Sequence, residues 1–295
     1  MPDRILDFSE EAVFLHVRYD QLVIERDDKP ETTVPLEEIA ALCVSNPQVR
    51  FSHAVLSGLA AKGGVLVVCN EKHLPIGMML PLTGHTTQTE RFSQQANAPL
   101  PTCKRLWQQL VKEKISAQGR ALQELRGKDE GLLALASRVK SGDSENLEAQ
   151  ASRRYWSALF GDSFRRDREA EDQNRHLNYG YAILRAIVAR AICASGLHPS
   201  LGVHHHNRYD SFCLADDLME PFRPLVDRAV AKWIEAHDPK ANFDRETKAA
   251  ILLALTGRFD LEGESRTLFD VSSRLASSLA LVFAGERQDL ILPEL

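Results

Sequence analysis

The 295-residue chain has few cysteines, and no two of them have the CxxC spacing. The five are scattered and odd in number, which is typical of a reducing cytoplasm and excludes the usual zinc-ribbon spacing. Long apolar runs are also missing. Residues 182–197 come nearest, but Arg185 and Arg190 interrupt them, so we expect no membrane-spanning segment. The first residues lack a basic stretch followed by an apolar run, and we expect a cytoplasmic protein without a secretory signal.

Several common catalytic and nucleotide-binding motifs are absent as well. The sequence contains no GxxxxGK[ST], no GxGxxG after a predicted strand, no GxSxG and no HExxH. These absences argue against a phosphate-binding P-loop, a dinucleotide fold, a serine hydrolase and a zinc peptidase. Hydrophobic residues make up 44% and charged residues 26%, so the chain is neither disordered nor fibrous.

A strong excess of positive charge is missing, since the formal net charge is −5. The acidic excess lies in residues 1–83, with 7 basic and 12 acidic residues, whereas residues 84–295 hold 29 of each. Of those 29 basic residues 21 are Arg, which suits two-pronged contacts to phosphate better than Lys does. The alternative is that the Arg content reflects genome composition. Net charge therefore does not exclude a nucleic-acid partner, because local surface charge decides binding.

The hydrophobic periodicity divides the chain into two parts. We predict strands over 4–8, 12–19, 21–26, 32–36, 39–44, 65–69 and 76–80, with a helix over 51–61. From about Thr87 the period changes from 2 to 3.6, which predicts helices over 106–125, 131–139, 146–160, 179–195, 225–236, 245–255 and 266–284. The fold class is therefore α+β: a small N-terminal mixed β domain (1–85) and a larger all-α C-terminal domain (86–295).

A run of carboxylates is the first candidate for chemistry. On a helix, Asp216 and Asp217 lie near the face of Glu220, and three acids so close need a cation such as Arg223 or a metal ion. The alternative is a capping box, in which Asp217 is the N-cap and Glu220 the third helical residue. The two interpretations are compatible, because the start of a capped helix can also present a ligand.

Histidines provide the second candidate, since four of the ten fall between His198 and His206. Imidazole with carboxylates suits Mn²⁺, Zn²⁺ or Fe²⁺, and an oxygen-dominated set with a single His favours Mg²⁺ or Mn²⁺. The alternative is a loop of solvated histidines. Glu148 likewise is either a ligand or a solvated residue favoured by the start of its helix. The residue pattern alone thus indicates a metal–carboxylate–histidine site in a helical domain, without deciding among these alternatives.

Three segments together carry a family resemblance. They are Asn146-Leu-Glu148, the NYGYAIL run from Asn178, and His205 followed by LADDLMEPFRP over 214–224. Their order and spacing resemble the CRISPR-associated integrase family, the endonuclease subunit of the spacer-acquisition complex. The variety found beside the RNA-guided effector nuclease of type II systems is the most similar. The resemblance covers nearly the whole chain.

The resemblance implies a catalytic ligand set. One divalent ion, Mg²⁺ or Mn²⁺, would be held by Glu148, His205 and Glu220, with Asp217 supporting the site as a neighbouring acid. In the family the His lies fifteen residues before the final acid, which selects His205 over the adjacent histidines. His204 and His206 remain alternatives to it.

The resemblance also implies the reaction and the partners. The chain would be a metal-dependent DNA endonuclease and integrase of prokaryotic antiviral immunity. It would insert new spacer DNA into a CRISPR array by attack of a 3′-hydroxyl on a phosphodiester. The implied partners are double-stranded DNA (spacer precursor and repeat), a second copy bound through the β domain, a small ferredoxin-like partner dimer and the type II effector nuclease.

Arginines crowd the helix of Glu148 and the segment after it. The candidate phosphate contacts are Arg153, Arg154, Arg165, Arg166 and Arg168. The alternative for each is a solvated surface of Arg and Asp side chains. Two rival functions use the same residues: a metal-dependent hydrolase of small phosphate esters, and a helical DNA-binding or scaffold protein in which the acids only cap a helix. A family member with a decayed site is a third possibility, which the intact ligand types disfavour.

Overall fold

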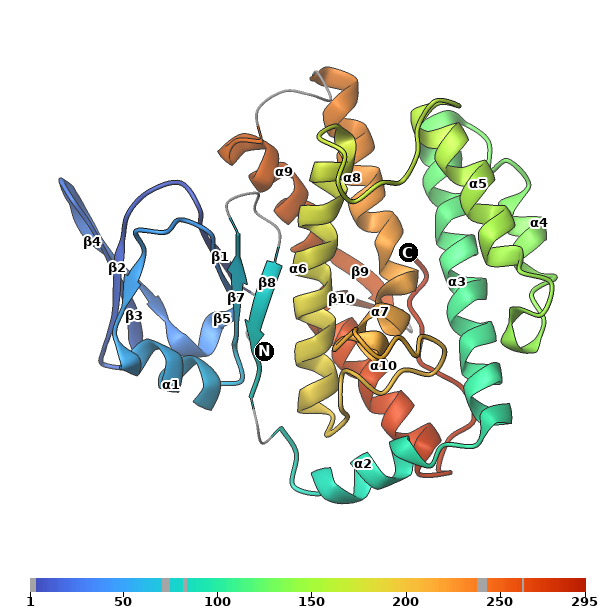
Figure 1. Ribbon diagram of the computed structural model, residues 1–295, viewed down its shortest axis with the longest axis horizontal. Coiled ribbons are helices and arrows are strands. Elements are labelled where there is room, and N and C mark those ends of the chain that lie inside the picture. Colours follow the sequence, from blue (N-terminus) through green and yellow to red (C-terminus); the bar gives the residue numbers. More distant parts are fainter. Residues whose placement is uncertain (1–3, 71–74, 82–83, 238–242, 262) are drawn as a thin grey trace.

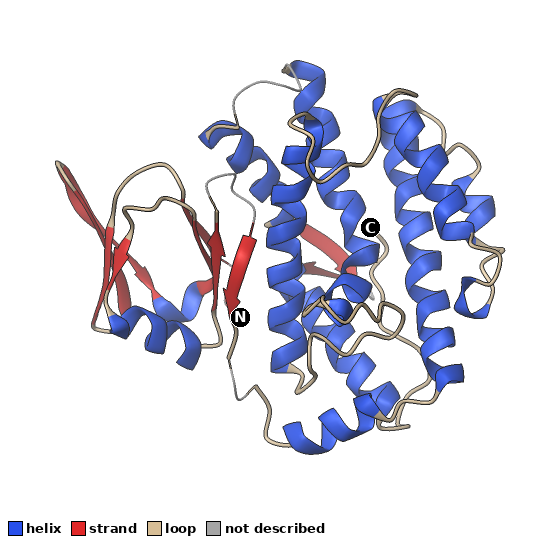
Figure 2. Ribbon diagram, in the orientation of Figure 1, coloured by secondary structure: helices blue, strands red, loops and turns tan. Residues whose placement is uncertain are grey.

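Strands form one end of the protein and helices the other, in a computed structural model that describes residues 4–70, 75–81, 84–237, 243–261 and 263–295 (Figure 1). The predicted α+β class is confirmed, since strands β1–β8 precede a mostly helical C-terminal part (Figure 2). The predicted junction near residue 85 falls beside residues 82–83, which lie outside the described part. None of the described helices is both long enough and apolar enough to cross a membrane.

The N-terminal part consists of two four-stranded sheets. The first has the order β1 (Arg4–Phe8), β5 (Ile39–Val44), β7 (Val65–Cys69), β8 (Pro75–Met79). The second has the order β4 (Lys29–Pro35), β3 (Gln21–Arg26), β2 (Phe14–Arg18), β6 (Arg50–Phe51). In the first sheet β1, β5 and β7 are parallel and β8 is antiparallel to β7. Helix α1 (His53–Ala61) confirms the helix predicted over 51–61, although Arg50–Phe51 before it forms the short strand β6, which was not predicted.

The first sheet is covered on both faces, which explains the uninterrupted apolar sequence of β5. Ile39 and Leu42 belong to a core shared with the second sheet and α1, whereas Ala40 and Cys43 belong to the core of the helical part. A strand buried on both faces has no need of alternating polar residues. The sheet is thus the layer that joins the two parts of the chain.

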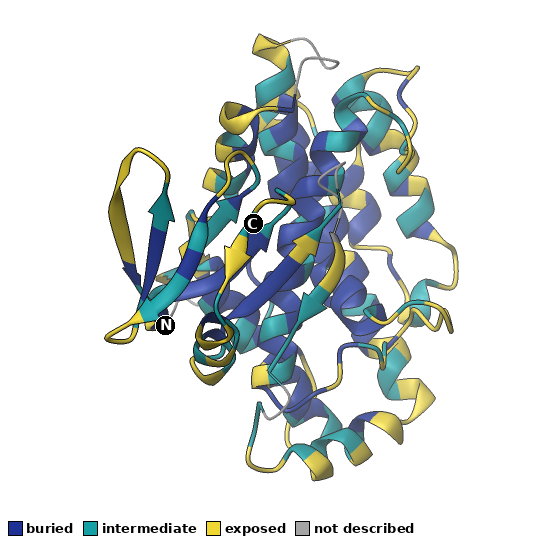
Figure 3. Ribbon diagram, turned by 60° about the vertical axis from the view of Figure 1, so that its left-hand side comes forward, coloured by how far each residue is buried: buried dark blue, intermediate teal, exposed yellow. Residues whose placement is uncertain are grey.

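The helical part is built around α6. Its helices are α2 (Gln88–Ala96), α3 (Leu100–Arg126), α4 (Leu132–Ala136), α5 (Leu147–Phe160), α6 (Gln173–Ala194), α7 (Cys213–Met219), α8 (Arg223–Ala236), α9 (Arg245–Leu255) and α10 (Leu268–Phe283). Short 3₁₀ turns are η1 (Leu36–Glu38), η2 (Ser141–Asp143) and η3 (Glu220–Phe222). Helix α6 packs against α7, α8, α9, α10 and the first sheet, and its residues are mostly buried. The middle of the helical part is accordingly dark blue in Figure 3.

Two features of the helical part differ from the prediction. It is not all-α, because β9 (Arg258–Leu261) and β10 (Glu264–Thr267) form an antiparallel hairpin. The last helix therefore begins at Leu268, where the hydroxyl of the N-cap Thr267 accepts a hydrogen bond from the backbone N–H of Asp270 (3.3 Å). The second difference is that helices α2 and α7 were not predicted.

Polar contacts fix the helices to the first sheet and its surroundings. The Tyr179 hydroxyl donates to Asp7 Oδ2 (2.6 Å), and Arg190 Nε donates to the carbonyl of Gly63 (2.6 Å). Lys248 Nζ lies 2.8 Å from Glu10 Oε1, with only 4% of the Lys side chain exposed. Contacts from α6 and α9 thus hold the two parts of the chain together.

All five cysteines are free. Burial is the main cause that raises the pKa of every one of these thiols; it raises that of Cys69 to about 12 and that of Cys193 to about 11. The thiols therefore act as small apolar side chains at neutral pH.

Candidate functional site

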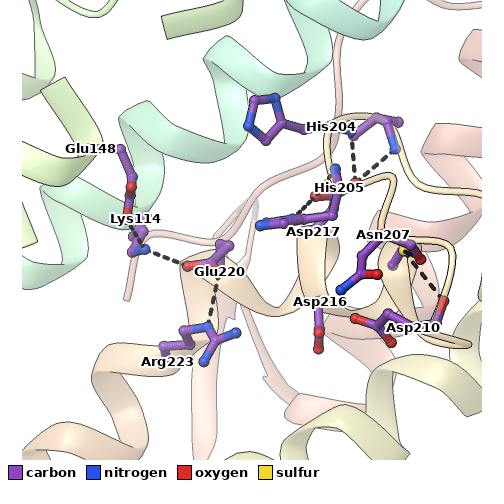
Figure 4. A network of polar contacts seen from close by, with 12 residues as sticks. Lys114, Glu148, His204, His205, Asn207, Asp210, Asp216, Asp217, Glu220 and Arg223 are labelled. Carbon is purple, nitrogen blue, oxygen red and sulfur yellow. Dashed lines mark hydrogen bonds and ion pairs between the residues drawn. The ribbon is translucent and has the colours of Figure 1, made fainter. Parts of the chain in front are cut away.

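Two predicted ligands, Glu148 and Glu220, converge on one lysine (Figure 4). Lys114 Nζ lies 2.5 Å from Glu148 Oε1 and 2.6 Å from Glu220 Oε2. The three residues come from α5, η3 and α3, which pack together although they are far apart in sequence. The structure therefore brings Glu148 and Glu220 to the same place, with the Lys114 ammonium between them.

Glu220 is buried and doubly paired. Its side chain is 7% exposed, and its Oε1 lies 3.0 Å from Arg223 Nε. Burial alone would raise the pKa of this carboxyl, but Arg223 and Lys114 lower it to about 2. Both cations in turn have raised pKa values despite their burial, because Glu220 favours their charged forms. Glu220 is thus ionised throughout the neutral pH range.

Asp217 organises the loop before α7 that contains His204, His205 and His206, here called the histidine loop. Its fully buried carboxylate accepts hydrogen bonds from the backbone N–H groups of Val203 (2.7 Å), His204 (2.9 Å) and His205 (3.3 Å). The His205 ring donates a further one from Nδ1, at 2.5 Å. Four donors on one carboxylate fix the loop against α7.

The capping-box interpretation of Asp217 and Glu220 is wrong. Helix α7 begins at Cys213, so Asp217 lies inside it, and its carboxylate serves the histidine loop instead of the helix start. The chain changes from α7 to the 3₁₀ turn at Glu220, where Pro221 supplies no backbone N–H. Glu220 therefore lies at a break between two helices, not in the first turn of one.

The ring of His205 is the imidazole that Asp217 holds. The hydrogen bond to Asp217 raises the pKa of His205, and its side chain remains 45% exposed. His204 instead stacks on Trp107 of α3, with ring centroids 4.0 Å apart and 2° between the planes. Trp107 also meets the His205 ring edge-on at 5.6 Å. Since Nδ1 of His205 is engaged, its Nε2 is the nitrogen left for a ligand.

Asp216 has a partner of its own. Arg185 donates to both of its oxygens, from Nε (2.7 Å) and Nη2 (2.8 Å). The three neighbouring acids of the sequence therefore do not share one cation. Asp216 pairs with α6, Asp217 with the histidine loop and Glu220 with Lys114 and Arg223. This separation removes the mutual repulsion that the sequence pattern implied.

Gly202 permits the close approach of the loop to α7. A Cβ at this position would lie 2.3 Å from the carbonyl oxygen of His205 and 2.9 Å from Asp217 Oδ2. Neither atom can move without loss of the carboxylate–loop hydrogen bonds. Residue 202 must therefore be glycine for the loop to close around Asp217.

The predicted arginines fall into two groups. Arg153, Arg154, Arg165 and Arg168 are exposed. Arg166 is held by the side-chain oxygens of Asn174 (2.9 Å) and Asn178 (2.6 Å) and lies over the Tyr181 ring. A cavity of about 230 Å³ contains Arg166, Arg168, Arg185 and Arg223 in its wall, with Glu169 as its acid. Arg223 connects this cationic cavity to Glu220.

The types of side chain at the site suit a hard divalent ion, but the side chains are not arranged in a metal-binding geometry. Two carboxylates and an imidazole are ligands that Mg²⁺ and Mn²⁺ accept. In the described part of the chain, no three His, Cys, Asp or Glu side chains are grouped closely enough to hold a metal. The Lys114 ammonium occupies the space between two of the predicted ligands. The residues therefore fit the ion by chemistry, provided that Lys114 moves.

Sequence reasoning missed Lys114, Trp107 and Arg185. A signal for Lys114 existed, because it lies four residues after Leu110 on the buried face of α3, next to Ile115. A charged residue on such a face needs a buried counter-charge. The partner, however, is not apparent from the pattern.

A buried carboxyl behind the site gives a pH-dependent prediction. Asp227 of α8 accepts hydrogen bonds from the hydroxyls of Tyr155 (3.0 Å) and Tyr181, and Arg223 and Arg166 are the cations that act on it. Burial raises its pKa to about 7, from an ordinary 3.8. The folded protein thus keeps a proton that the unfolded chain loses near pH 4. The contribution of this group to stability is therefore complete below that pH and is lost as the pH rises to about 7.

Asp227→Asn should remove this contribution. Between pH 5 and pH 8 the free energy of unfolding of the wild type should fall by about 3 kcal/mol relative to the variant. Urea unfolding at the two pH values measures the difference. Parallel pH profiles for the two proteins would contradict it.

Comparison with known proteins places the chain among relatives of one kind. The family model described as CRISPR associated protein Cas1 matches residues 8–261. A protein of Neisseria meningitidis serogroup C (strain 8013), named CRISPR-associated endonuclease Cas1, is 37% identical over 279 residues, covering 93% of this chain and 91% of the relative.

Solved structures share the fold at low sequence identity. "Casposase bound to integration product" superposes with a TM-score of 0.81 at 19% identity, covering 97% of this chain and 92% of that one. A chain of the "Cas6-RT-Cas1--Cas2 complex" gives 0.75 at 18% identity, with 99% of this chain matched to 36% of the larger one.

Proposed function

The chain belongs to the family of CRISPR associated protein Cas1, and from this we propose that it is a metal-dependent DNA endonuclease and integrase. It inserts new spacer DNA into a CRISPR array, as the type II-like variety of the family. A 3′-hydroxyl of the spacer attacks a phosphodiester of the array, and one P–O bond breaks as another forms. Such a transesterification requires no protein nucleophile.

One observation carries the proposal: Glu148 and Glu220 converge on Lys114, and Asp217 orients a His205 ring that is near enough to Glu220 to act on the pKa of that carboxyl. Metal-binding histidines usually donate their second ring N–H to a carboxylate, which fixes the ring and raises its basicity. In our proposal Glu148, Glu220 and the Nε2 of His205 hold Mg²⁺ or Mn²⁺. When bound, that ion would supply Lewis-acid activation of the scissile phosphodiester.

The arginine cavity supports a phosphate-bearing substrate. Four arginines line it, and Arg223 lies at once in its wall and against Glu220. Guanidinium groups hold phosphate oxygens by paired hydrogen bonds, so this wall would orient the DNA strand beside the carboxylates. We propose the exposed Arg153, Arg154, Arg165 and Arg168 as further contacts along the strand. Arg166 contributes mainly to the structure of the cavity wall, through its hydrogen bonds to Asn174 and Asn178.

The same membership supports a proposal for the assembly. We propose that residues 1–85 form a dimerisation domain and residues 86–295 the catalytic domain. Double-stranded DNA, a second copy of the chain, a small ferredoxin-like partner dimer and the type II effector nuclease are the proposed partners. The similar "Cas6-RT-Cas1--Cas2 complex" joins Cas1 with Cas2, which supports an assembly of this kind.

The test is a strand-transfer and cleavage assay on branched DNA with Mn²⁺, Mg²⁺ or EDTA. We expect activity with metal, none in EDTA, and a loss of at least about a hundredfold in Glu148→Ala and His205→Ala, because each removes a proposed ligand. Glu145→Ala is the matched control, since Glu145 precedes the same helix and forms ion pairs with exposed basic side chains.

The outcomes separate the rival functions. Full activity in Glu148→Ala or His205→Ala would refute the ligand assignment. Hydrolysis of small phosphate esters without salt-sensitive DNA binding would favour a phosphohydrolase. If the wild type is inactive alone, the assay is repeated with the ferredoxin-like partner; continued inactivity would favour a scaffold role.

A further inference from the structure

Lys114 balances the negative charge of two carboxylates at the proposed metal site. Its side chain is 10% exposed and lies between two carboxylates from different elements, at 2.5 Å and 2.6 Å. Glu148 and Glu220 carry two negative charges, and Lys114 and Arg223 carry two positive ones. The cluster is therefore neutral without a metal ion. The lysine holds together two acids that would otherwise repel each other.

A divalent ion changes this balance. The same two carboxylates cannot surround both an ammonium group and Mg²⁺ or Mn²⁺ closely, because their ligand distances are short and the two cations repel strongly in a poorly solvated site. Arg223 is held in place by a second contact, since its guanidinium stacks over the Tyr181 ring at 4.7 Å while its Nε lies 3.0 Å from Glu220. Lys114 has a long flexible side chain, and an ammonium group is a mobile point charge. Of the two cations, Lys114 is therefore the one that can move.

We propose that Lys114 is a built-in counter-cation of the metal site. Its ammonium group keeps Glu148 and Glu220 together while no ion is bound, and a divalent ion displaces it. Lys114 is thus a positioning residue, and this role rests on the proposed function of the same site. It makes metal binding weak in the absence of DNA, because the ion must first break two short ion pairs.

Bound DNA would offset the free-energy cost of displacing Lys114 from its two carboxylates. A phosphate that enters beside Arg223 offers the displaced ammonium group a new anionic partner and offsets the charge of the ion. Metal and DNA should therefore strengthen each other's binding, by equal factors. The lysine would in this way restrict metal loading to the DNA-bound protein.

The experiment measures Mn²⁺ binding to the full-length protein by electron paramagnetic resonance of the free ion. Lys114→Gln should bind Mn²⁺ about tenfold or more tightly than the wild type, since a competing charge is gone. In EDTA the same variant should melt at a lower temperature, and Mn²⁺ should raise its melting temperature by more than it raises that of the wild type. Lys112→Gln is the control, being the same change on the exposed side of α3.

Lys114→Arg keeps the positive charge and provides a second test in case Lys114→Gln does not fold. It should bind Mn²⁺ no more tightly than the wild type, and tighter binding would overturn the displacement argument. Equal or weaker Mn²⁺ binding by folded Lys114→Gln would also overturn it. If the wild type binds Mn²⁺ and Glu148→Gln does not, while Lys114→Gln matches the wild type, only this inference fails. If neither the wild type nor Lys114→Gln binds Mn²⁺, with or without duplex DNA, the proposed metal function fails as well.

Discussion

Glu220→Ala should abolish strand transfer and also destabilise the fold by about 3–5 kcal/mol, because it leaves buried cations without their counter-charge. Lys114 would keep only Glu148, and Arg223 would lose the carboxylate 3.0 Å from its Nε. Glu148→Ala should abolish the same activity at a stability cost of about 1 kcal/mol. The reason is that Glu148 is 28% exposed and Lys114 retains Glu220 when it is removed.

Urea unfolding at pH 7 measures the difference in stability between the two variants. The strand-transfer assay tests whether both have lost activity. Glu220→Gln is the matched control, since it preserves the volume of the side chain and removes only the charge. It should be nearly as destabilised as Glu220→Ala if the charge is what matters. A Glu220→Ala protein as stable as Glu148→Ala would show that solvent screens the two cations.

Asp217→Ala should unfold the histidine loop and lower the free energy of unfolding by about 3 kcal/mol or more. It leaves three backbone N–H groups and the His205 ring without their acceptor. His205 would lose its fixed orientation, so Mn²⁺ affinity should fall by about ten- to a hundredfold. Thermal melting and Mn²⁺ binding measure the two effects.

Asp216→Ala provides the comparison for this variant. Asp216 is the adjacent acid on α7 and pairs with Arg185, whose side chain is 30% exposed and can turn to water. Its replacement should leave the loop closed and Mn²⁺ affinity within about threefold of the wild type. Equal loss of affinity in the two variants would argue that α7 as a whole, not the Asp217 carboxylate, positions the loop.

Local pattern predicted most elements because their burial is periodic. The apolar run 39–44 predicted β5, and the structure places it in the centre of a sheet covered on both faces. The hairpin of β9 and β10 escaped prediction because its strands have four residues each and contain several charged side chains. Helix α7 escaped because prolines follow it closely, which suggested a helix start at Asp217 instead of an end at Met219.

The local sequence pattern predicted the candidate site less well than it predicted the fold. Glu148, His205 and Glu220 became a set only through the family resemblance, since no spacing along the chain places α5 beside the turn at Glu220. Lys114 comes from a third element and was missed, although its place on an apolar helix face is anomalous. Which side chains meet across helices is decided by tertiary packing, and a single sequence contains no direct signal of it.

The raised pKa values of the thiols have a practical consequence for labelling. All five cysteines have raised pKa values, so little thiolate is present at neutral pH and maleimides would react slowly with the native chain. A cysteine introduced on the exposed surface, with an ordinary pKa, would take up a fluorophore first. At neutral pH, labelling of the wild-type background should therefore favour the introduced cysteine over the five native ones.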